Sequence, residues 1–236
     1  MTSAVTVTVQ QVVFTRDAPR WHALADALGL AAPFAPSPEW GEFVGDGVLA
    51  VHHSAACADR VELNVLVRDL DAVEKALAGH DVTRGEMAGV GRMLTVRTQA
   101  GVELAVFAGA RATAGEVAVQ PIWFQDDIAE ARAILEALGM RAEIAADAGG
   151  WVQLRADGGG TVGLHSASGR SEADGAGFGL SFEVRGDLDA LATRLREAGF
   201  DASVVDEAYT RTIRITEPAV TINAAQTDLH GYHRES

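Results

Sequence analysis

Amide, imidazole and carboxylate side chains at matching places in the two halves of the chain are the residues that could do chemistry. Gln10 returns as Gln120, and His52 returns as His165. A neutral imidazole can hold Zn, Ni, Fe or Mn, and it can equally contact an organic ligand. A buried glutamine needs hydrogen-bond partners, which a metal, a small molecule or a polar network could supply. A strand carboxylate such as Glu62 could bind a metal or act as a general base.

Composition narrows the partners. Among the 236 residues, 48% are hydrophobic and 33 acidic residues face 19 basic ones, for a net charge of −14. Such a charge repels polyphosphates, so we expect no nucleic-acid binding and no binding to an anionic membrane. Cys57 is the single cysteine, so neither an internal disulfide nor a cysteine-based zinc site is expected. The sequence shows no signal peptide and no apolar run of membrane-spanning length, which predicts a cytoplasmic protein.

An internal repeat predicts how these residues are positioned. Phe14 and Asp17 return 110 residues later as Phe124 and Asp127, just as Gln10 returns as Gln120. Further matches follow in the same order at a slowly growing spacing: Trp40 with Trp151, Asp46-Gly47 with Asp157-Gly158, Leu63 with Leu180, Asp69 with Asp187, and Gly79 with Gly199. Loop insertions between fixed elements would produce this growth. We therefore predict two tandem domains, residues 1–112 and residues 113–236.

Each domain divides again into two modules of one strand, one helix and further strands. Alternating and helical apolar spacings, with an aspartate before and a glycine after several helices, define the expected elements. Expected strands are 4–14, 40–44, 47–53, 61–67, 82–85, 92–98, 102–107, 117–124, 151–156, 161–166, 178–184, 202–205, 211–216 and 220–224. Expected helices are 17–28, 70–78, 127–138 and 188–198. Residues 109–115 form the expected linker, and the glycine-rich residues 169–177 an expected loop that could act as a rim or lid.

The order of these motifs resembles the glyoxalase/bleomycin-resistance/extradiol-dioxygenase (vicinal oxygen chelate) superfamily. The resembling features are a helix ending Leu28-Gly29-Leu30, then Trp40 and Asp46-Gly47, then Asp69-Leu70-Asp71-Ala72. They cover nearly the whole chain and occur twice. The resemblance implies an α+β fold of four βαβββ modules, which pair into two glyoxalase-like domains with curved mixed sheets. Each pair of modules would form a cup that holds a small molecule and, in many members, a divalent metal.

The resemblance also implies which positions face the cups. In the first domain the metal positions fall on Gln10, His52 and Glu62, with Ala105 where a carboxylate is expected. We take the first three as the candidate metal site, with Glu62 as the best catalytic candidate. In the second domain the same positions fall on Gln120, His165, Gly179 and Asn223. With Glu183, which faces the same cup, we assign Gln120, His165 and Asn223 to ligand binding.

Two local alternatives stay open at this point. Strand alternation favours His52 as the counterpart of His165, whereas a one-residue slip would select His53. The histidines at 230 and 233 lie in a polar C-terminal tail, which we expect to be disordered or to dock across the mouth of a cup.

Three hypotheses for function follow. The first is a cytoplasmic protein that binds a small, largely apolar molecule without a metal, as the drug-sequestering members of the superfamily do; the missing carboxylates favour it. The second is a divalent-metal lyase, isomerase or dioxygenase that uses the first domain. In the third, the second domain is only a structural partner of the first. The chain could be a monomer or a homodimer, and either no cofactor or one divalent metal (Zn, Ni, Fe or Mn) is expected.

Overall fold

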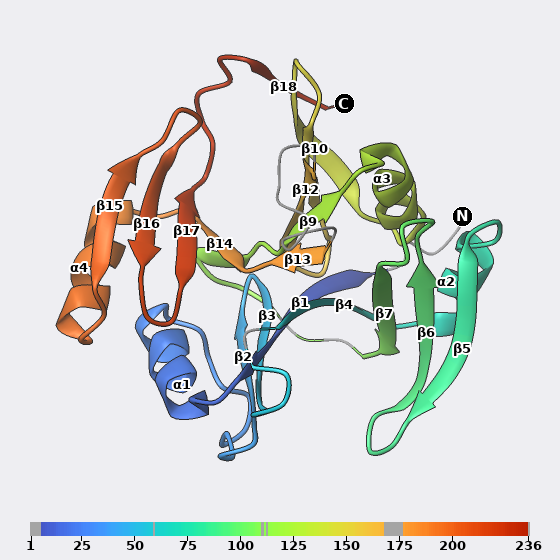
Figure 1. The fold of residues 1–236 in the computed structure, drawn as a ribbon, viewed down its shortest axis with the longest axis horizontal. Helices are drawn as coiled ribbons and strands as arrows, with labels where there is room; N and C mark the ends of the chain where they lie inside the picture. Colours follow the sequence, from blue (N-terminus) through green and yellow to red (C-terminus); the bar gives the residue numbers. More distant parts are fainter. Residues whose placement is uncertain (1–5, 59, 110, 112, 168–176, 236) are drawn as a thin grey trace.

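One curved sheet carries the first half of the chain. The computed structural model describes residues 6–58, 60–109, 111, 113–167 and 177–235 (Figure 1). Seven strands form the first sheet in the order β2-β3-β1-β4-β7-β6-β5. They are β1 (Val7–Thr15), β2 (Trp40–Gly45), β3 (Gly47–His53), β4 (Val61–Val67), β5 (Asp81–Met87), β6 (Gly91–Arg97) and β7 (Glu103–Ala108). Because β1 and β4 pair antiparallel at the centre, they join the two modules of this half.

The helices of the described residues begin and end within two residues of the bounds that the sequence predicts. They are α1 (Ala18–Ala27), α2 (Leu70–Ala76), α3 (Ile128–Ala137) and α4 (Leu188–Glu197). An aspartate caps each one by accepting a hydrogen bond from a backbone N–H of the first turn: Asp17, Asp69, Asp127 and Asp187. A glycine with positive φ follows each one: Gly29, Gly79, Gly139 and Gly199. These shared caps explain why the helices could be located from sequence.

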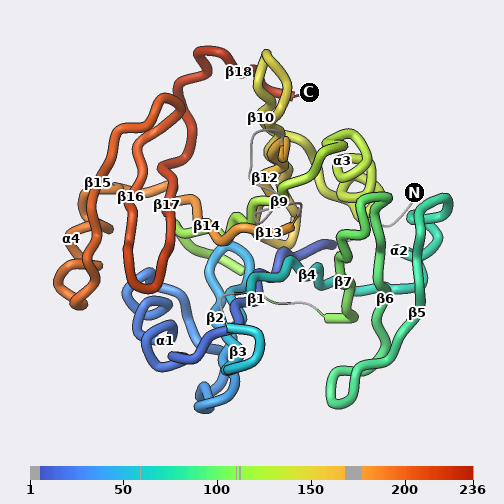
Figure 2. The backbone as a smooth tube through the Cα atoms, in the orientation of Figure 1, coloured from blue at the N-terminus to red at the C-terminus, as the bar shows by residue number. Residues whose placement is uncertain are grey.

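The second half follows the same plan but forms two sheets. The first has the order β13-β9-β12-β11-β10-β18 and the second β15-β16-β17-β14-β8. The strands are β8 (Val117–Val119), β9 (Ile122–Gln125), β10 (Arg141–Ala146), β11 (Trp151–Arg155), β12 (Thr161–Ser166), β13 (Gly177–Gly179), β14 (Ser181–Val184), β15 (Ala202–Asp206), β16 (Arg211–Ile215), β17 (Val220–Ala224) and β18 (Tyr232–Arg234). The α+β architecture of curved mixed sheets is therefore confirmed; Figure 2 shows the path of the chain through it.

Two long strands expected in the second half are each interrupted. The expected strand 117–124 is divided into β8 and β9 at Pro121, and the expected strand 178–184 into β13 and β14 at Leu180. Proline has no N–H, so it cannot donate to the ladder opposite Leu180. The pairing continues in one register across the break, from Gly179 with Ile122 to Phe182 with Val119.

Other elements also differ from expectation. Strands β10 and β18 were not predicted, and the first module has only a single bridge, Ala31 with Val44, where the third module has β10. Strand β18 forms because the C-terminal tail docks: it pairs with β10 after crossing from β17 (Figure 1). Of the loop expected at 169–177, all but the last residue lies outside the described residues, as do positions 110 and 112 of the expected linker.

Each half of the chain contacts the other through a turn between two of its strands. The turn between β2 and β3 pairs with β8, where Asp46 bridges to Ala118. The turn between β11 and β12 reaches β1, where the Val9 N–H donates to the Gly159 carbonyl over 2.9 Å. One continuous apolar core crosses this junction. The chain leaves the first sheet after β7 and enters another sheet at β8. This change lies close to the domain boundary expected between residues 112 and 113, and the boundary itself stays a prediction. None of the helices in the described ranges is long and apolar enough to cross a membrane.

Candidate functional site

The cup of the second half encloses a cavity of about 360 Å³. Its lining residues come from β9, β11 and β12 and from β14 and β17, among other segments. All four residues predicted to bind a ligand line it: Gln120, His165, Glu183 and Asn223. Tyr232, from the docked tail, lines it as well. The structure therefore brings the four predicted residues to one place, while their assignment to ligand binding stays a prediction.

A connected polar network forms the floor of this cavity. The Gln120 amide donates to Gln153 over 3.1 Å and to Glu183 over 3.4 Å. Gln153 in turn donates to Glu183 over 3.1 Å. The Asn223 amide donates to Gln120 and to the Ser181 hydroxyl, both over 3.1 Å. Buried amides held in such a network keep their orientation, so they present a fixed set of polar atoms to a ligand.

The network leaves specific atoms free for a ligand. Within the described part of the chain, Asn223 Oδ1 and Gln226 Nε2 are buried without a hydrogen-bond partner. One is an acceptor and the other a donor, and both residues line the cavity. An unsatisfied buried polar atom costs free energy, which a ligand with matching groups would recover.

Glu183 is the ionisable residue of the floor. It is only 5% exposed, and burial raises the pKa of its carboxyl, against the opposing charge of Arg185 and the hydrogen bond from Gln153. The Arg185 Nε lies 3.5 Å from Glu183 Oε1, which is long for a charged pair. The carboxyl is therefore held mainly by neutral amides.

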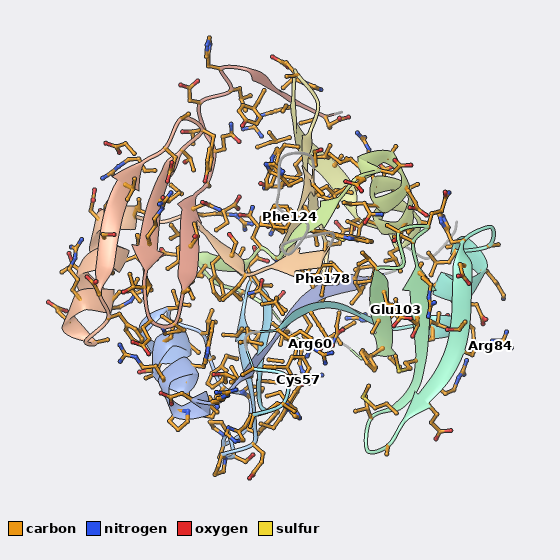
Figure 3. The ribbon with its side chains drawn as sticks, viewed as in Figure 1. Cys57, Arg60, Arg84, Glu103, Phe124 and Phe178 are labelled. Atoms are coloured by element: carbon orange, nitrogen blue, oxygen red, sulfur yellow. The ribbon has the colours of Figure 1, made fainter. Side chains whose placement is uncertain are left out.

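The rings of His165, Phe124 and Trp151 form an aromatic wall of the cavity beside this floor, and the first half has a matching set of rings. The His165 ring lies 5.5 Å from Phe124 and 5.9 Å from Trp151, measured between ring centres. Figure 3 labels Phe124, which lies in the space between β9 and the strands β14 and β17. His52 stands between Phe14 and Trp40 at 5.2 and 5.9 Å in the same way.

These matching registers identify the counterpart of His165. Phe14 pairs with His52 just as Phe124 pairs with His165. His52, not His53, is therefore the equivalent residue. The Nδ1 of His165 lies 2.7 Å from the carbonyl oxygen of Ser166, which can only accept, so this nitrogen carries the proton. Its Nε2 remains an acceptor in the neutral ring.

The cup of the first half holds the candidate metal residues, but they are spread along the strands. Gln10, His52 and Glu62 all line its cavity of about 560 Å³. Gln10 pairs with Val48 whereas His52 pairs with Phe14, four residues further along. Four residues of strand span roughly 13 Å, too far for one ion to reach both from these backbone positions. Glu62 instead forms an ion pair with Arg60 over 2.8 Å.

These donors do not fit a divalent cation well in either cup. No group of three or more histidine, cysteine, aspartate or glutamate residues within the described ranges could hold a metal ion. In the second cup the amides of Gln120 and Asn223 are bonded to each other, and Glu183 is the carboxylate that joins them. The assignment of Gln10, His52 and Glu62 to a metal therefore gains no support from the geometry and stays a prediction.

The pairing registers show that the two cups differ in residue type at matching positions. Gln10 lies opposite Asn64, and the Gln120 N–H donates to Ser181, so Asn64 and Ser181 correspond. Two residues along, Leu66 therefore corresponds to Glu183. Leu66 packs in a small apolar cluster with Val48 and Phe107, where the second cup has its polar network.

The same registers correct one sequence-based correspondence. Ala105 pairs with Asn64 and Thr221 with Ser181, so the counterpart of Ala105 is Thr221. Asn223, which pairs with Glu183, corresponds to Phe107 instead. The correspondence expected from sequence was two residues out at this strand. A two-residue shift keeps the same face of a strand, so the alternation pattern could not reveal it.

Several residues of the second cavity were missed by sequence reasoning. Gln153 is two residues after Trp151 and so shares its face of β11, a signal that the pattern contained. Tyr209 and Tyr232 reach the cavity from a loop and from the tail, and no periodicity marks such positions.

The order of modules and the curved sheets are those of the vicinal oxygen chelate fold, and solved structures share this fold. A 2,3-dioxygenase, LapB, from a Pseudomonas species matches with a TM-score of 0.63 and 14% identity over 99% of this chain and 96% of that one. The substrate complex of homoprotocatechuate 2,3-dioxygenase from Brevibacterium fuscum, bound to 3,4-dihydroxyphenylacetate, matches with a TM-score of 0.61 and 15% identity over 95% and 82%. A halotolerant catechol dioxygenase, BphC, matches with a TM-score of 0.56 and 12% identity over 96% and 89%. No family model and no curated protein sequence matches the chain. At these identities the likeness concerns the fold.

Proposed function

We propose that this protein binds a small, largely apolar aromatic molecule in the cup of its second half. The observation that carries the proposal is the combination of an aromatic wall with a fixed amide floor around one cavity of about 360 Å³. That volume lies at the lower end of the range for small-molecule sites, roughly 300–1,000 Å³. It suits a ligand with one or two rings.

The wall and the floor have separate tasks in this proposal. Phe124, Trp151 and Tyr232 supply apolar surface that a ring can pack against, burying area that water would otherwise cover. The free atoms of Asn223 and Gln226 then set the orientation of the ligand through two hydrogen bonds. No metal is needed for either task.

A divalent-metal enzyme of lyase, isomerase or dioxygenase type is the alternative. The dioxygenases of similar fold make it worth testing, but those structures share only 12–15% identity with this chain. The spread of Gln10 and His52 along the strands and the ion pair of Glu62 with Arg60 do not favour it.

A thermal-shift screen of one- and two-ring aromatic compounds, followed by calorimetry of the hits, tests binding. A ligand present at about 100 times its Kd should stabilise the fold by roughly 2.7 kcal/mol. Trp151→Ala should weaken binding of the hits at least tenfold, because the ring forms part of the wall. Trp40→Ala is the matched control, since Trp40 is its duplicate in the first cup and should leave this binding unchanged.

Three outcomes decide between the functions. Hits that depend on Trp151 and not on Trp40 support the proposal. No hit, or hits that depend only on Trp40, would overturn it. Stoichiometric Zn, Ni, Fe or Mn by plasma mass spectrometry, lost in His52→Ala, would favour the metal enzyme instead.

A further inference from the structure

Asp46 is a buried carboxylate that the first half of the chain places behind the second cup. It occupies the turn between β2 and β3 and is 5% exposed. Its backbone is fixed to β8: the Asp46 N–H donates to Val117 over 3.0 Å, and its carbonyl accepts from Val119 over 2.9 Å. The Gly160 N–H donates to Asp46 Oδ1 over 2.9 Å. Three hydrogen bonds from or to the backbone therefore hold this residue at the junction of the two halves.

Two arginines of the second half point at Asp46. Its Oδ2 lies 2.8 Å from Arg155 Nη2 and 2.6 Å from Arg185 Nη1. Arg155 comes two residues after Gln153 in β11, and Arg185 comes directly after the last residue of β14, two residues beyond Glu183. The same Arg185 guanidinium lies 3.5 Å from Glu183, so its shorter contact is with Asp46.

This arrangement leaves the Glu183 carboxylate with one long contact to a cation, the 3.5 Å approach of Arg185 Nε to its Oε1. A carboxylate offers about four lone-pair sites, and Glu183 accepts from the neutral amides of Gln120 and Gln153. The charged groups around it are Arg185, Arg155 and Glu143. Asp46 binds both arginines, and Glu143 lies 4.0 Å from Arg155, so two carboxylates outside the floor face the two guanidinium groups.

We propose that Asp46 is a positioning residue for the second cup: it holds Arg155 and Arg185 behind the floor, and thereby leaves Glu183 to bind a positively charged group of the ligand. This rests on the proposed function and specifies its ligand class, an aromatic molecule with a cationic substituent. The first half would then act as a partner that sets the charge of the second cup.

The pKa shifts have the direction that this arrangement requires. Burial alone would raise the pKa of Asp46, but the hydrogen bonds and charges of Arg155, Gly160 and Arg185 lower it overall. Burial raises the pKa of Glu183 and the nearby arginines do not reverse that shift. A cationic ligand group would supply a closer charge partner than Arg185, which stays 3.5 Å away.

Benzamidine and benzamide provide the test, because they have nearly the same shape and differ in charge. The measured quantity is the ratio of their affinities, by calorimetry on the full chain. We expect the parent to favour benzamidine, and Glu183→Gln to remove that preference. Asp46→Asn should reduce the ratio roughly tenfold, since Arg185 would then turn to Glu183 as its remaining carboxylate partner.

Matched variants separate positioning from a loss of fold. Asp157→Asn alters the duplicate aspartate, which pairs with exposed Arg141, and should leave the ratio unchanged. Arg185→Gln should raise the ratio, a direction that a purely structural role does not produce. If Asp46→Asn does not fold, Arg185→Gln carries the test, and an unchanged ratio there overturns the proposal.

Failure of this inference differs from failure of the proposed function. Binding of other aromatic compounds through Trp151, with no preference for benzamidine, would overturn the ligand class and leave the proposed function standing. A preference that survives in a folded Asp46→Asn variant would overturn the role of Asp46. The absence of any aromatic ligand in the whole screen would overturn both.

Discussion

Replacing Gly47 by alanine tests the contact between the two halves at the turn that carries Asp46. Gly47 has a φ of +93°, a conformation that residues with a side chain rarely adopt. A Cβ atom at this position would lie 2.3 Å from Val119 Cγ2 and 3.0 Å from Gly160 Cα. Both neighbours belong to the second half, so the substitution would push the halves apart.

The expected loss of stability has two parts. The unfavourable φ should cost roughly 1–3 kcal/mol, and overlap with a packed interior should add roughly 1–3 kcal/mol. Gly79→Ala separates them, because Gly79 has a similar φ of +104° but no atom lies within 4 Å of the Cβ that alanine would add there. Gly79→Ala should therefore show the strain alone.

Urea unfolding of the parent and both variants, followed by circular dichroism and tryptophan fluorescence, measures the difference. We expect Gly47→Ala to lose about 1–3 kcal/mol more than Gly79→Ala. Equal losses in the two variants would refute the close approach of the β2–β3 turn to β8. That result would also remove the basis for placing Asp46 behind the second cup.

Three further predictions concern the two cups. Because burial raises the pKa of Glu183, its contribution to stability is complete below the ordinary pKa of a glutamate and is lost as pH rises through the raised value. Glu183→Gln should therefore gain stability relative to the parent as pH rises. A constant difference between the urea midpoints of the two proteins across that range would contradict this. Asp46 has the opposite sign: its pKa is lowered, so its contribution is present above the ordinary aspartate value and is lost as pH falls, and Asp46→Asn should flatten the acid limb of the stability curve. Phe107→Ala removes a ring that is 6% exposed from the apolar cluster of the first cup, so it should cost about 3–5 kcal/mol in urea unfolding, without changing the affinity of ligands in the second cup.

Much of the fold could be predicted because its signals are local. The aspartate caps and glycine stops of the helices each act within one turn, so they are visible in a short stretch of sequence. The repeat then placed Gln120 and His165 on the faces that line a cavity. By contrast, no local signal in the sequence indicates β10 or β18, and β18 forms through the antiparallel pairing of the C-terminal tail with β10.

The order of the elements, the duplication, and the face on which Gln10, Gln120 and His165 lie were visible in the amino-acid sequence, whereas the choice between His52 and His53 needed the strand register. These properties follow from alternation and capping, which depend on neighbours in the chain. One difference between the cups was not visible there: Leu66 and Phe107 of the first cup stand where the second cup has Glu183 and Asn223. The register that shows this is set by pairing between segments distant in sequence. The contact of Asp46 in one half with Arg155 and Arg185 in the other likewise required the folded chain, since charges so distant in sequence meet only when the two halves bring them together.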